Sequence, residues 1–361
     1  MRKHFIISLI LLSGLFSARV VAEEEPIKLQ DNPPDSYVVV KGDTLWDISK
    51  RFLKDPWQWP QIWGMNREQI KNPHLIYPGD VVVLDRSGAS PALRLVRGGD
   101  RGGDRAGDRG GSTAGGRETV KLGPRVRAED LARAAIPTIP YSAIEPFLSQ
   151  PLVIEAGGLD NAPRIIATQD QRVVLGAGDF AYVQDMPKDK GLDWQIYRLG
   201  KTFFDPESQE VLGYEAIYLG QAKVAKFAEA SPIEIITSKQ EINSGDRLAA
   251  AVPGALVNYV PRAPNKGVKA RIISIYGGLN EGGPNNIVAI SKGTREGLEK
   301  GHVLALYHYS GIIKNTRGEP LKLPDERYGL LLVFRTFEKV SYALVMQASR
   351  PVQVFDVAQT P

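Results

Sequence analysis

Residues 36–52 carry a strand pattern that changes abruptly into a helix pattern. The β-branched triplet Val38-Val39-Val40 is typical of a strand, and Gly42 permits a sharp turn after it. Thr44 is suited to cap a helix, with Asp47 three residues later to complete a capping box. Apolar residues then recur at the spacing of one buried helical face, at Leu45, Ile48 and Phe52. The segment therefore predicts a strand, a tight turn and an amphipathic helix.

A second helix and a closing strand complete this block, which spans residues 36–85. Trp59-Pro60 marks the helix start, because proline suits a first helical turn, and the apolar run 81–84 predicts the last strand. Four of the five tryptophans of the chain lie here: Trp46, Trp57, Trp59 and Trp63. Trp46 either packs beneath the turn or borders a ligand. The other three tryptophans either pack in the core of the block or form an exposed aromatic face that contacts a partner.

Beyond residue 125 the chain consists mainly of β-branched and alternating runs bounded by glycine and proline. Helix signals are few, so region 125–361 is predicted to be mainly β and the whole chain α+β. Three residues recur at a constant offset of 109: Gly220, Val224 and Glu229 match Gly329, Val333 and Glu338. The match predicts two similar modules, near 150–250 and 265–361. A chance match of common strand residues is the alternative.

Two segments have the composition of linkers. Residues 23–35 are polar and contain prolines, which predicts a short linker. Residues 86–124 hold a near-repeat of Gly-Gly-Asp-Arg, whose glycines are costly to order and which has little apolar surface to bury. Ten basic and four acidic residues lie between Arg86 and Arg127. This positive charge indicates either an anionic partner, such as a wall polymer, or a solvated spacer.

Residues 1–22 have the features of a cleaved secretory signal: a basic start, an apolar run too short to span a bilayer, and the small-residue ending Val20-Val21-Ala22. Three of the 45 basic residues (Arg2, Lys3 and Arg19) fall within it, which leaves 42 against 41 acidic ones. The secreted form is therefore nearly neutral, and we expect no nucleic-acid partner. The chain has no cysteine, which excludes a disulfide framework.

The block 36–85 resembles a LysM domain through "YVVVKGDTLWDIS" (37–49), Asn66 and "NPHLIYPGDVVVL" (72–84). The resemblance implies a βααβ fold that binds N-acetylglucosamine-containing glycans, which in bacteria means peptidoglycan. It also implies a shallow groove between the turn before the first helix and the loop before the last strand. The groove residues carried over are Gly42, Asp43, Thr44, Leu45, Asn72, Pro73, Leu75, Ile76 and Tyr77. The middle segment 54–63 departs from the family by being longer and richer in tryptophan.

The order of segments resembles the LysM proteins that accompany type IV pilus secretins. That order is a signal, one tryptophan-rich LysM domain, a glycine-rich linker and a β-rich tail. The resemblance implies a periplasmic protein that tethers an outer-membrane secretin ring to the cell wall. If several copies sit around one ring, they form a homo-oligomer whose linked grooves gain avidity for the wall. We therefore expect peptidoglycan and a secretin as partners.

A peptidoglycan hydrolase, or a regulator of one, is the alternative function. Enzymes with a thiol nucleophile are excluded, because the chain lacks cysteine. Zinc-dependent enzymes need several histidines with carboxylates, whereas the secreted form keeps only His74, His302 and His308. The glycine-rich stretch 277–286 lacks the ending of a phosphate-binding loop and predicts a hairpin or surface loop. We expect a protein without catalytic residues, bound metal or cofactor.

Overall fold

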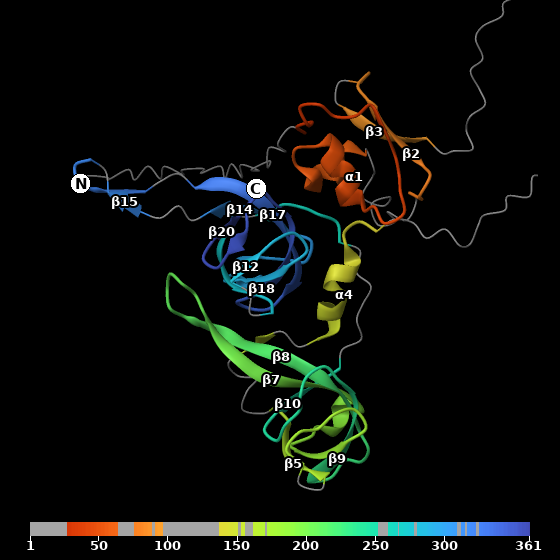
Figure 1. Cartoon of the computed structure of the whole chain (residues 1–361), viewed down its shortest axis with the longest axis vertical. Helices are drawn as coiled ribbons and strands as arrows, with labels where there is room; N and C mark the ends of the chain where they lie inside the picture. The colour runs from red at the N-terminus through yellow and green to blue at the C-terminus, as the bar shows by residue number, and fades with distance from the viewer. Residues whose placement is uncertain are drawn as a thin grey trace, which may run out of the picture.

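The computed structural model has an N-terminal domain and two β-barrels, which follow one another along the longest axis of the molecule (Figure 1). The N-terminal domain lies at one end, the barrel of residues 269–359 in the middle, and the barrel of residues 153–250 at the other end. The structure describes residues 27–63, 76–88, 91–96, 137–150, 153–155, 162–169, 172–251, 259–265, 267–277, 280–308, 312–314, 316–322 and 325–361. The predicted signal 1–22 lies outside these residues, as does most of the predicted linker 86–124.

The N-terminal domain has the predicted order of strand, helix, helix and strand. Its elements are β1 (Ser36–Val38), α1 (Leu45–Phe52), the 3-10 helix η1 (Pro56–Gln58), α2 (Trp59–Ile62) and β2 (Val81–Asp85). Leu45, Ile48 and Phe52 of α1 are all fully buried and pack in one cluster with Ile62 and Val82. The helical spacing of apolar residues thus places α1 against the small sheet, as predicted.

Residues from both predicted linkers pack on this domain in the structure. Strand β3 (Ala92–Val96) pairs antiparallel with β2, and Leu93 is buried in the domain core. On the other side, Leu29 forms a β-bridge with Leu53 and packs against the same core. Two apolar residues in each polar segment pack against the domain core, Ile27 and Leu29 in the first and Leu93 and Leu95 in the second.

The first barrel is formed by β5 to β10, with β4 added at one edge. Its strand order is β4-β8-β7-β10-β5-β6-β9, and a pairing of β8 with β9 closes it. The strands are β4 (Val153–Ile154), β5 (Arg164–Thr168), β6 (Phe180–Gln184), β7 (Asp193–Phe204), β8 (Val211–Val224), β9 (Ala230–Ser238) and β10 (Arg247–Ala250). Its interior includes Trp194, Ile196, Leu219 and Ile233.

The second barrel is closed by six strands in the order β11-β13-β18-β17-β14-β20. These are β11 (Lys269–Ile275), β13 (Ile287–Ile290), β14 (Val303–His308), β17 (Glu326–Thr336), β18 (Ser341–Ala348) and β20 (Val357–Gln359). Two small pairs accompany it: β12 (Glu281–Gly282) with β19 (Val352–Gln353), and β15 (Ile312–Lys314) with β16 (Pro320–Lys322). The tail is therefore mainly β, as predicted.

The two barrels have the same strand order. Matching β5 with β11, β6 with β13, β9 with β18, β8 with β17, β7 with β14 and β10 with β20 makes the two arrangements identical. Gly220 and Val224 lie in β8, and their partners Gly329 and Val333 lie in the matching β17. A shared strand order is what a duplication would produce, and the duplication itself stays a prediction.

Strands of the second barrel are buried on both faces, which explains why "GLLLVF" (329–334) does not alternate. Leu331 and Val333 pack inside the barrel, whereas Leu330, Leu332 and Phe334 join a second cluster on its outside. The helix α4 (Tyr141–Ser149) covers this outer cluster through Ile144. Arg335 donates hydrogen bonds to the carbonyl oxygens of Phe147 and Gln150, at the end of α4. No helix in the described ranges has the length and apolar character needed to cross a membrane.

The matched glycines are sites where a side chain does not fit. A Cβ added at Gly220 would lie 2.1 Å from the carbonyl oxygen of Thr237, and one at Gly329 would lie 2.4 Å from that of Gln347. Gly220→Ala and Gly329→Ala should each destabilise their barrel by roughly 2–4 kcal/mol, because strand backbones must separate. Gly176→Ala is the matched control, since nothing lies within 4 Å of its Cβ position. Thermal unfolding of the three variants measures the loss of stability. Equal midpoints for all three would contradict the close approach of the strand backbones at Gly220 and Gly329.

Candidate functional site

The turn between β1 and α1 is held by one carboxylate. Gly42 has a left-handed backbone with φ of 101°, so the chain reverses here at little steric cost. Asp43 accepts hydrogen bonds from the backbone N–H of Val40 and from the hydroxyl of Tyr37, both at 2.9 Å. Burial and the neighbouring Asp43 carboxylate raise the pKa of Tyr37. The turn is therefore rigid before any ligand arrives.

Thr44 caps α1 as predicted. Its Oγ1 accepts a hydrogen bond from the Asp47 backbone N–H at 3.1 Å and donates one to the Asp47 carboxylate at 2.7 Å. The acidic side chain in the first helical turn also suits the helix dipole. The tight turn and the cap together fix where the first residues of α1 point.

The predicted groove has two walls, the turn 40–44 before α1 and the turn 77–80 before β2. The second wall lies beside the first. The Tyr77 backbone N–H donates to the Asp80 carboxylate at 3.0 Å, and Gly79 has φ of 98°. Val39 connects the two walls, because its N–H donates to the Asp80 carbonyl and its carbonyl accepts from Gly79. The structure thus brings the turn 40–44 and the turn 77–80 side by side, as the predicted groove requires.

The predicted groove residues differ in how they can reach a ligand. Thr44, Leu45 and Ile76 are buried, so their side chains support the walls from within. Gly42 is exposed, and Asp43 and Tyr77 are partly exposed. Asn72, Pro73 and Leu75 lie outside the described residues, as do His74 and Asn66.

The first wall also contacts the rest of the chain. The backbone N–H groups of Leu45 and Trp46 donate to the carbonyl oxygens of Pro137 and Thr138, at 3.0 and 3.2 Å. Asp55, which follows α1, forms a salt bridge with Arg327 of the second barrel. The N-terminal domain is therefore docked on the C-terminal region through the start of α1, the side next to the groove.

The tryptophans divide between two cores. Trp59 and Trp63 are buried in the N-terminal domain's own core. Trp46 is 1% exposed and joins the cluster formed by α4 and the outside of the second barrel, and Trp57 packs against that cluster. Trp46 is thus not open to solvent, and it packs against the C-terminal region rather than in the core of its own domain. A single sequence gave no signal for this contact, because its partners lie more than 90 residues away.

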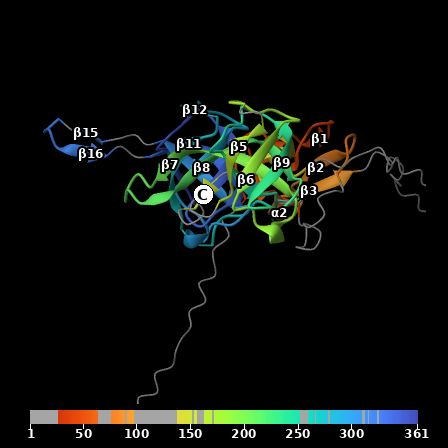
Figure 2. The same ribbon diagram turned by 90° about the horizontal axis from the view of Figure 1, so that it is seen from below.

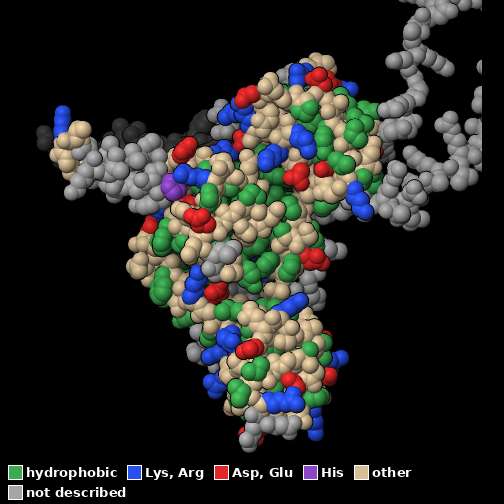
Figure 3. All heavy atoms as spheres, viewed as in Figure 1, with side chains coloured by type: hydrophobic (Ala, Val, Ile, Leu, Met, Phe, Trp, Pro, Cys, Tyr) green, Lys and Arg blue, Asp and Glu red, His purple; other side chains and the backbone are tan. Residues whose placement is uncertain are grey.

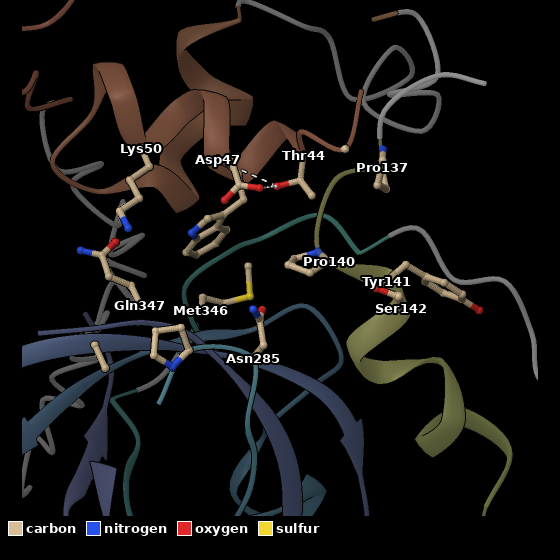
Figure 4. Close-up of a pocket in the computed structure, with 14 residues that line it drawn as sticks. Thr44, Asp47, Lys50, Pro137, Pro140, Tyr141, Ser142, Asn285, Met346 and Gln347 are labelled. Atoms are coloured by element: carbon tan, nitrogen blue, oxygen red, sulfur yellow. Dashed lines mark hydrogen bonds between the residues drawn. The ribbon is translucent and has the colours of Figure 1, made fainter. Parts of the chain in front are cut away.

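A pocket of about 540 Å³ opens where the start of α1 meets the C-terminal region (Figure 4). Thr44 and Asp47 lie on one side of it, and Asn285 and Met346 lie on the other. Asn285 belongs to the glycine-rich stretch predicted to form a hairpin or loop, and the structure places it in the turn before β13. The sequence pattern did not identify Ser142, Asn285 or Gln347 as site residues.

The two histidines of the tail lie in different environments, His302 buried and His308 partly exposed beside Asp356. His302 is 1% exposed, its Nδ1 accepts from the Glu299 backbone N–H at 3.1 Å, and burial lowers its pKa. His308 lies 3.1 Å from Asp356, which also accepts from the Tyr328 hydroxyl. Within the described parts of the chain, no three or more His, Cys, Asp or Glu residues are grouped so as to hold a metal ion.

Comparison with known proteins identifies a LysM domain at residues 37–85. This range includes both turns of the candidate groove. An uncharacterized protein of Bacillus subtilis (strain 168), YqbP, is 40% identical over 55 residues. The matched stretch covers 13% of this chain and 25% of that relative, so the chain spans about a quarter of the relative's length. LysM domains bind peptidoglycan-type glycans, and the N-terminal domain has the corresponding fold.

Proposed function

We propose that this chain is an exported, non-catalytic protein that binds peptidoglycan through its LysM domain and anchors an outer-membrane secretin to the cell wall. The observation that carries the first half is the pair of adjacent turns, 40–44 and 77–80, within the LysM match. Fixed backbone groups in these turns suit the acetamido and hydroxyl groups of a glycan. Basic and acidic side chains are interspersed over the face shown in Figure 3, which suits an uncharged ligand.

Cosedimentation with purified sacculi tests wall binding. The secreted form (residues 23–361) is expected in the pellet with insoluble peptidoglycan. Added salt separates groove binding from attraction to the basic segment 86–127, because screening weakens the second much more. Soluble muropeptides in the supernatant would instead support the hydrolase alternative. A protein that stays in the supernatant without releasing fragments would contradict both.

The secretin half of the proposal is supported by the segment order described above and by a surface at the far end of the molecule. Outward-facing apolar side chains on β5, β6 and β9 form what we call the outer patch: Ile166, Phe180, Tyr182 and Ile236, each 40–46% exposed. Tyr182 is opposite Ala167 and Pro232 in the strand register, and Phe180 is opposite the exposed Glu234, so the patch spans three strands and includes one carboxylate. In Figure 2 these strands lie side by side.

The position of the outer patch suits a tether. The barrel that carries it lies at the opposite end of the molecule from the LysM domain, with the second barrel between them (Figure 1). Clustered exposed apolar side chains are typical of protein contact sites. One end would thus bind glycan while the other binds the secretin, and neither contact would obstruct the other.

Several copies around one secretin ring would strengthen a weak wall contact. A single shallow glycan groove has an expected dissociation constant of roughly micromolar to millimolar. Linked copies can gain about 10²- to 10⁴-fold in avidity. A homo-oligomeric arrangement on the ring is therefore part of the proposal.

A further inference from the structure

A hairpin of the first barrel extends onto the second barrel (Figure 1). The pairing of β7 with β10 ends at Tyr197, and residues 198–217 of β7 and β8 continue as a hairpin that we call the first arm. Phe203 and Leu212, on either side of its tip, are buried in the cluster on the outside of the second barrel. The first arm therefore packs against the neighbouring barrel.

The tip of the first arm is acidic, and the surface that it contacts is basic. Hydrogen bonds from Arg295 and Lys339 lower the pKa of Glu210 to about 2. Each acidic residue of the tip 205–210 contacts a base of the second barrel: Asp205 contacts Lys292 at 2.9 Å, Glu207 contacts Arg271 at 3.1 Å, and Glu210 contacts Arg295 at 2.9 Å and Lys339 at 2.7 Å. Complementary charge thus holds the arm of one barrel on the next barrel.

The second barrel repeats the arrangement found at the base of the first arm. Arg198 donates to Asp246 at 2.8 Å where β7 leaves the first barrel, and His308 lies 3.1 Å from Asp356 where β14 leaves the second. The two pairs are 110 positions apart in sequence. Each aspartate also accepts a hydrogen bond from the backbone N–H three residues before it, at 2.7 and 2.9 Å. With the shared strand order, these contacts make the connection from β14 to β17 the counterpart of the first arm.

That connection carries the hairpin of β15 and β16, which we call the second arm. Among the described residues, these two strands pair only with each other. Figure 1 and Figure 2 both show the hairpin projecting away from its barrel. An isolated two-stranded hairpin is marginally stable in water, and its open edges can pair with another chain. The second arm is therefore suited to dock on a barrel outside its own chain.

The first barrel has a surface that corresponds to the one under the first arm. Arg164 is the counterpart of Arg271, because the residue after each donates its backbone N–H to the carbonyl of the matched aspartate. The 3-10 helix η4 (Lys188–Lys190) and the turn 225–229 correspond to η5 (Thr294–Glu296) and the turn 337–340. We call this surface the end face, and its exposed charged side chains include the bases Arg164, Lys188, Lys190 and Lys226 and the acids Asp185, Asp189 and Glu229.

The end face points away from the second barrel. The turn 225–229 follows Val224, which is the end of β8 opposite to the tip of the first arm. The end face thus belongs to the far end of the molecule in Figure 1, and none of its charged residues is part of the outer patch. One chain therefore has a second arm at one place and a matching end face at another.

We propose that the second arm of one copy docks on the end face of the next copy, as the first arm docks on the second barrel within one chain. Such a head-to-tail contact closes into a ring or continues as a filament. The arm contains Lys314, Arg317, Glu319 and Lys322, and the end face also carries both signs of charge, so the contact weakens with added salt. The inference rests on the homo-oligomer of the proposed function and gives it a specific contact.

Sedimentation velocity of the chain 23–361 over a concentration series tests the proposal. The wild type is expected to self-associate. Replacement of residues 312–322 by Gly-Gly, which fits because Ile312 is opposite Lys322, should give monomers. Arg164→Glu should weaken association about three- to tenfold, the effect of losing one ion pair and adding a like charge. Lys239→Glu is the matched control, because Lys239 is exposed at the opposite end of β9, and it should behave like the wild type.

A mixing experiment tests the direction of the contact. The chain without the second arm keeps its end face, and Arg164→Glu keeps its arm, so an equimolar mixture should form heterodimers where neither variant associates alone. Thermal unfolding checks that both barrels are folded in every variant. A wild type that stays monomeric, undiminished association without the second arm, or no heterodimer in the mixture would each overturn the head-to-tail contact. Sacculus binding is measured separately, and its loss in the wild type would contradict the proposed wall function instead.

Discussion

The chain from residue 23 to residue 361 with Ile76→Glu is expected to remain in the supernatant when it is mixed with sacculi. Ile76 is 1% exposed and packs with Leu45, Trp59 and Val82 in the LysM core. A glutamate at this position either remains buried with its charge unpaired or forces the adjacent turn 77–80 away from the core so that water reaches the charge. Both outcomes cost several kcal/mol of domain stability. A domain with so small a core has only a few kcal/mol of stability to lose. We therefore expect the LysM domain to unfold while the barrels stay folded.

Val38→Glu is the control for this prediction. It places the same charged residue in the same domain, but Val38 is 57% exposed and lies on strand β1. It should cosediment like the wild type. Circular dichroism and thermal unfolding would show whether the barrel transition persists in both variants. Wall binding by Ile76→Glu at the wild-type level would show that the LysM domain is not the wall contact, and would favour the basic segment 86–127.

Charged substitutions in the outer patch should have the opposite effect. Phe180→Asp and Tyr182→Asp are expected to abolish copurification with the outer-membrane secretin while cosedimentation with sacculi is retained. Both side chains are 40% exposed, so the barrel tolerates the change, whereas an apolar contact does not tolerate a desolvated carboxylate. Affinity purification from detergent-solubilised envelopes measures the loss.

Phe204→Asp is the matched control in the same barrel. Phe204 is 47% exposed but ends strand β7, where it pairs with Val211, away from β6 and β9. It should copurify like the wild type. Equal recovery of the secretin with Phe180→Asp, Tyr182→Asp and Phe204→Asp would show that the outer patch is not the contact.

The LysM domain was the most predictable part, because its signals are local. The spacing of Leu45, Ile48 and Phe52 and the pair Thr44 and Asp47 determine the eight residues of α1 and its cap. Strand β3 was not predicted, because its short apolar run Ala92–Val96 is directly followed by the polar, glycine-rich repeat and was included in the linker. Such a strand forms only once β2 offers it an edge. Strand propensity alone does not indicate whether a neighbouring strand is available for pairing.

The composite pocket could not be predicted, because its residues meet only in the folded chain. Trp46, Ser142, Asn285 and Gln347 are far apart in sequence and belong to four different elements or turns. The tail posed a related difficulty. Its strands are buried on both faces around α4, so their continuous apolar runs indicated strands but not which face meets which neighbour.

Bridging between sacculi and secretin is the most direct test of the proposed anchor. Detergent-solubilised outer membrane that contains the secretin is mixed with sacculi, with and without the purified secreted chain, and the pellet is probed for the secretin. The account predicts that the secretin pellets only when the wild-type chain is present, and that Ile76→Glu and Phe180→Asp each fail to support it. Equal amounts of secretin in the pellet with and without the chain would contradict the account.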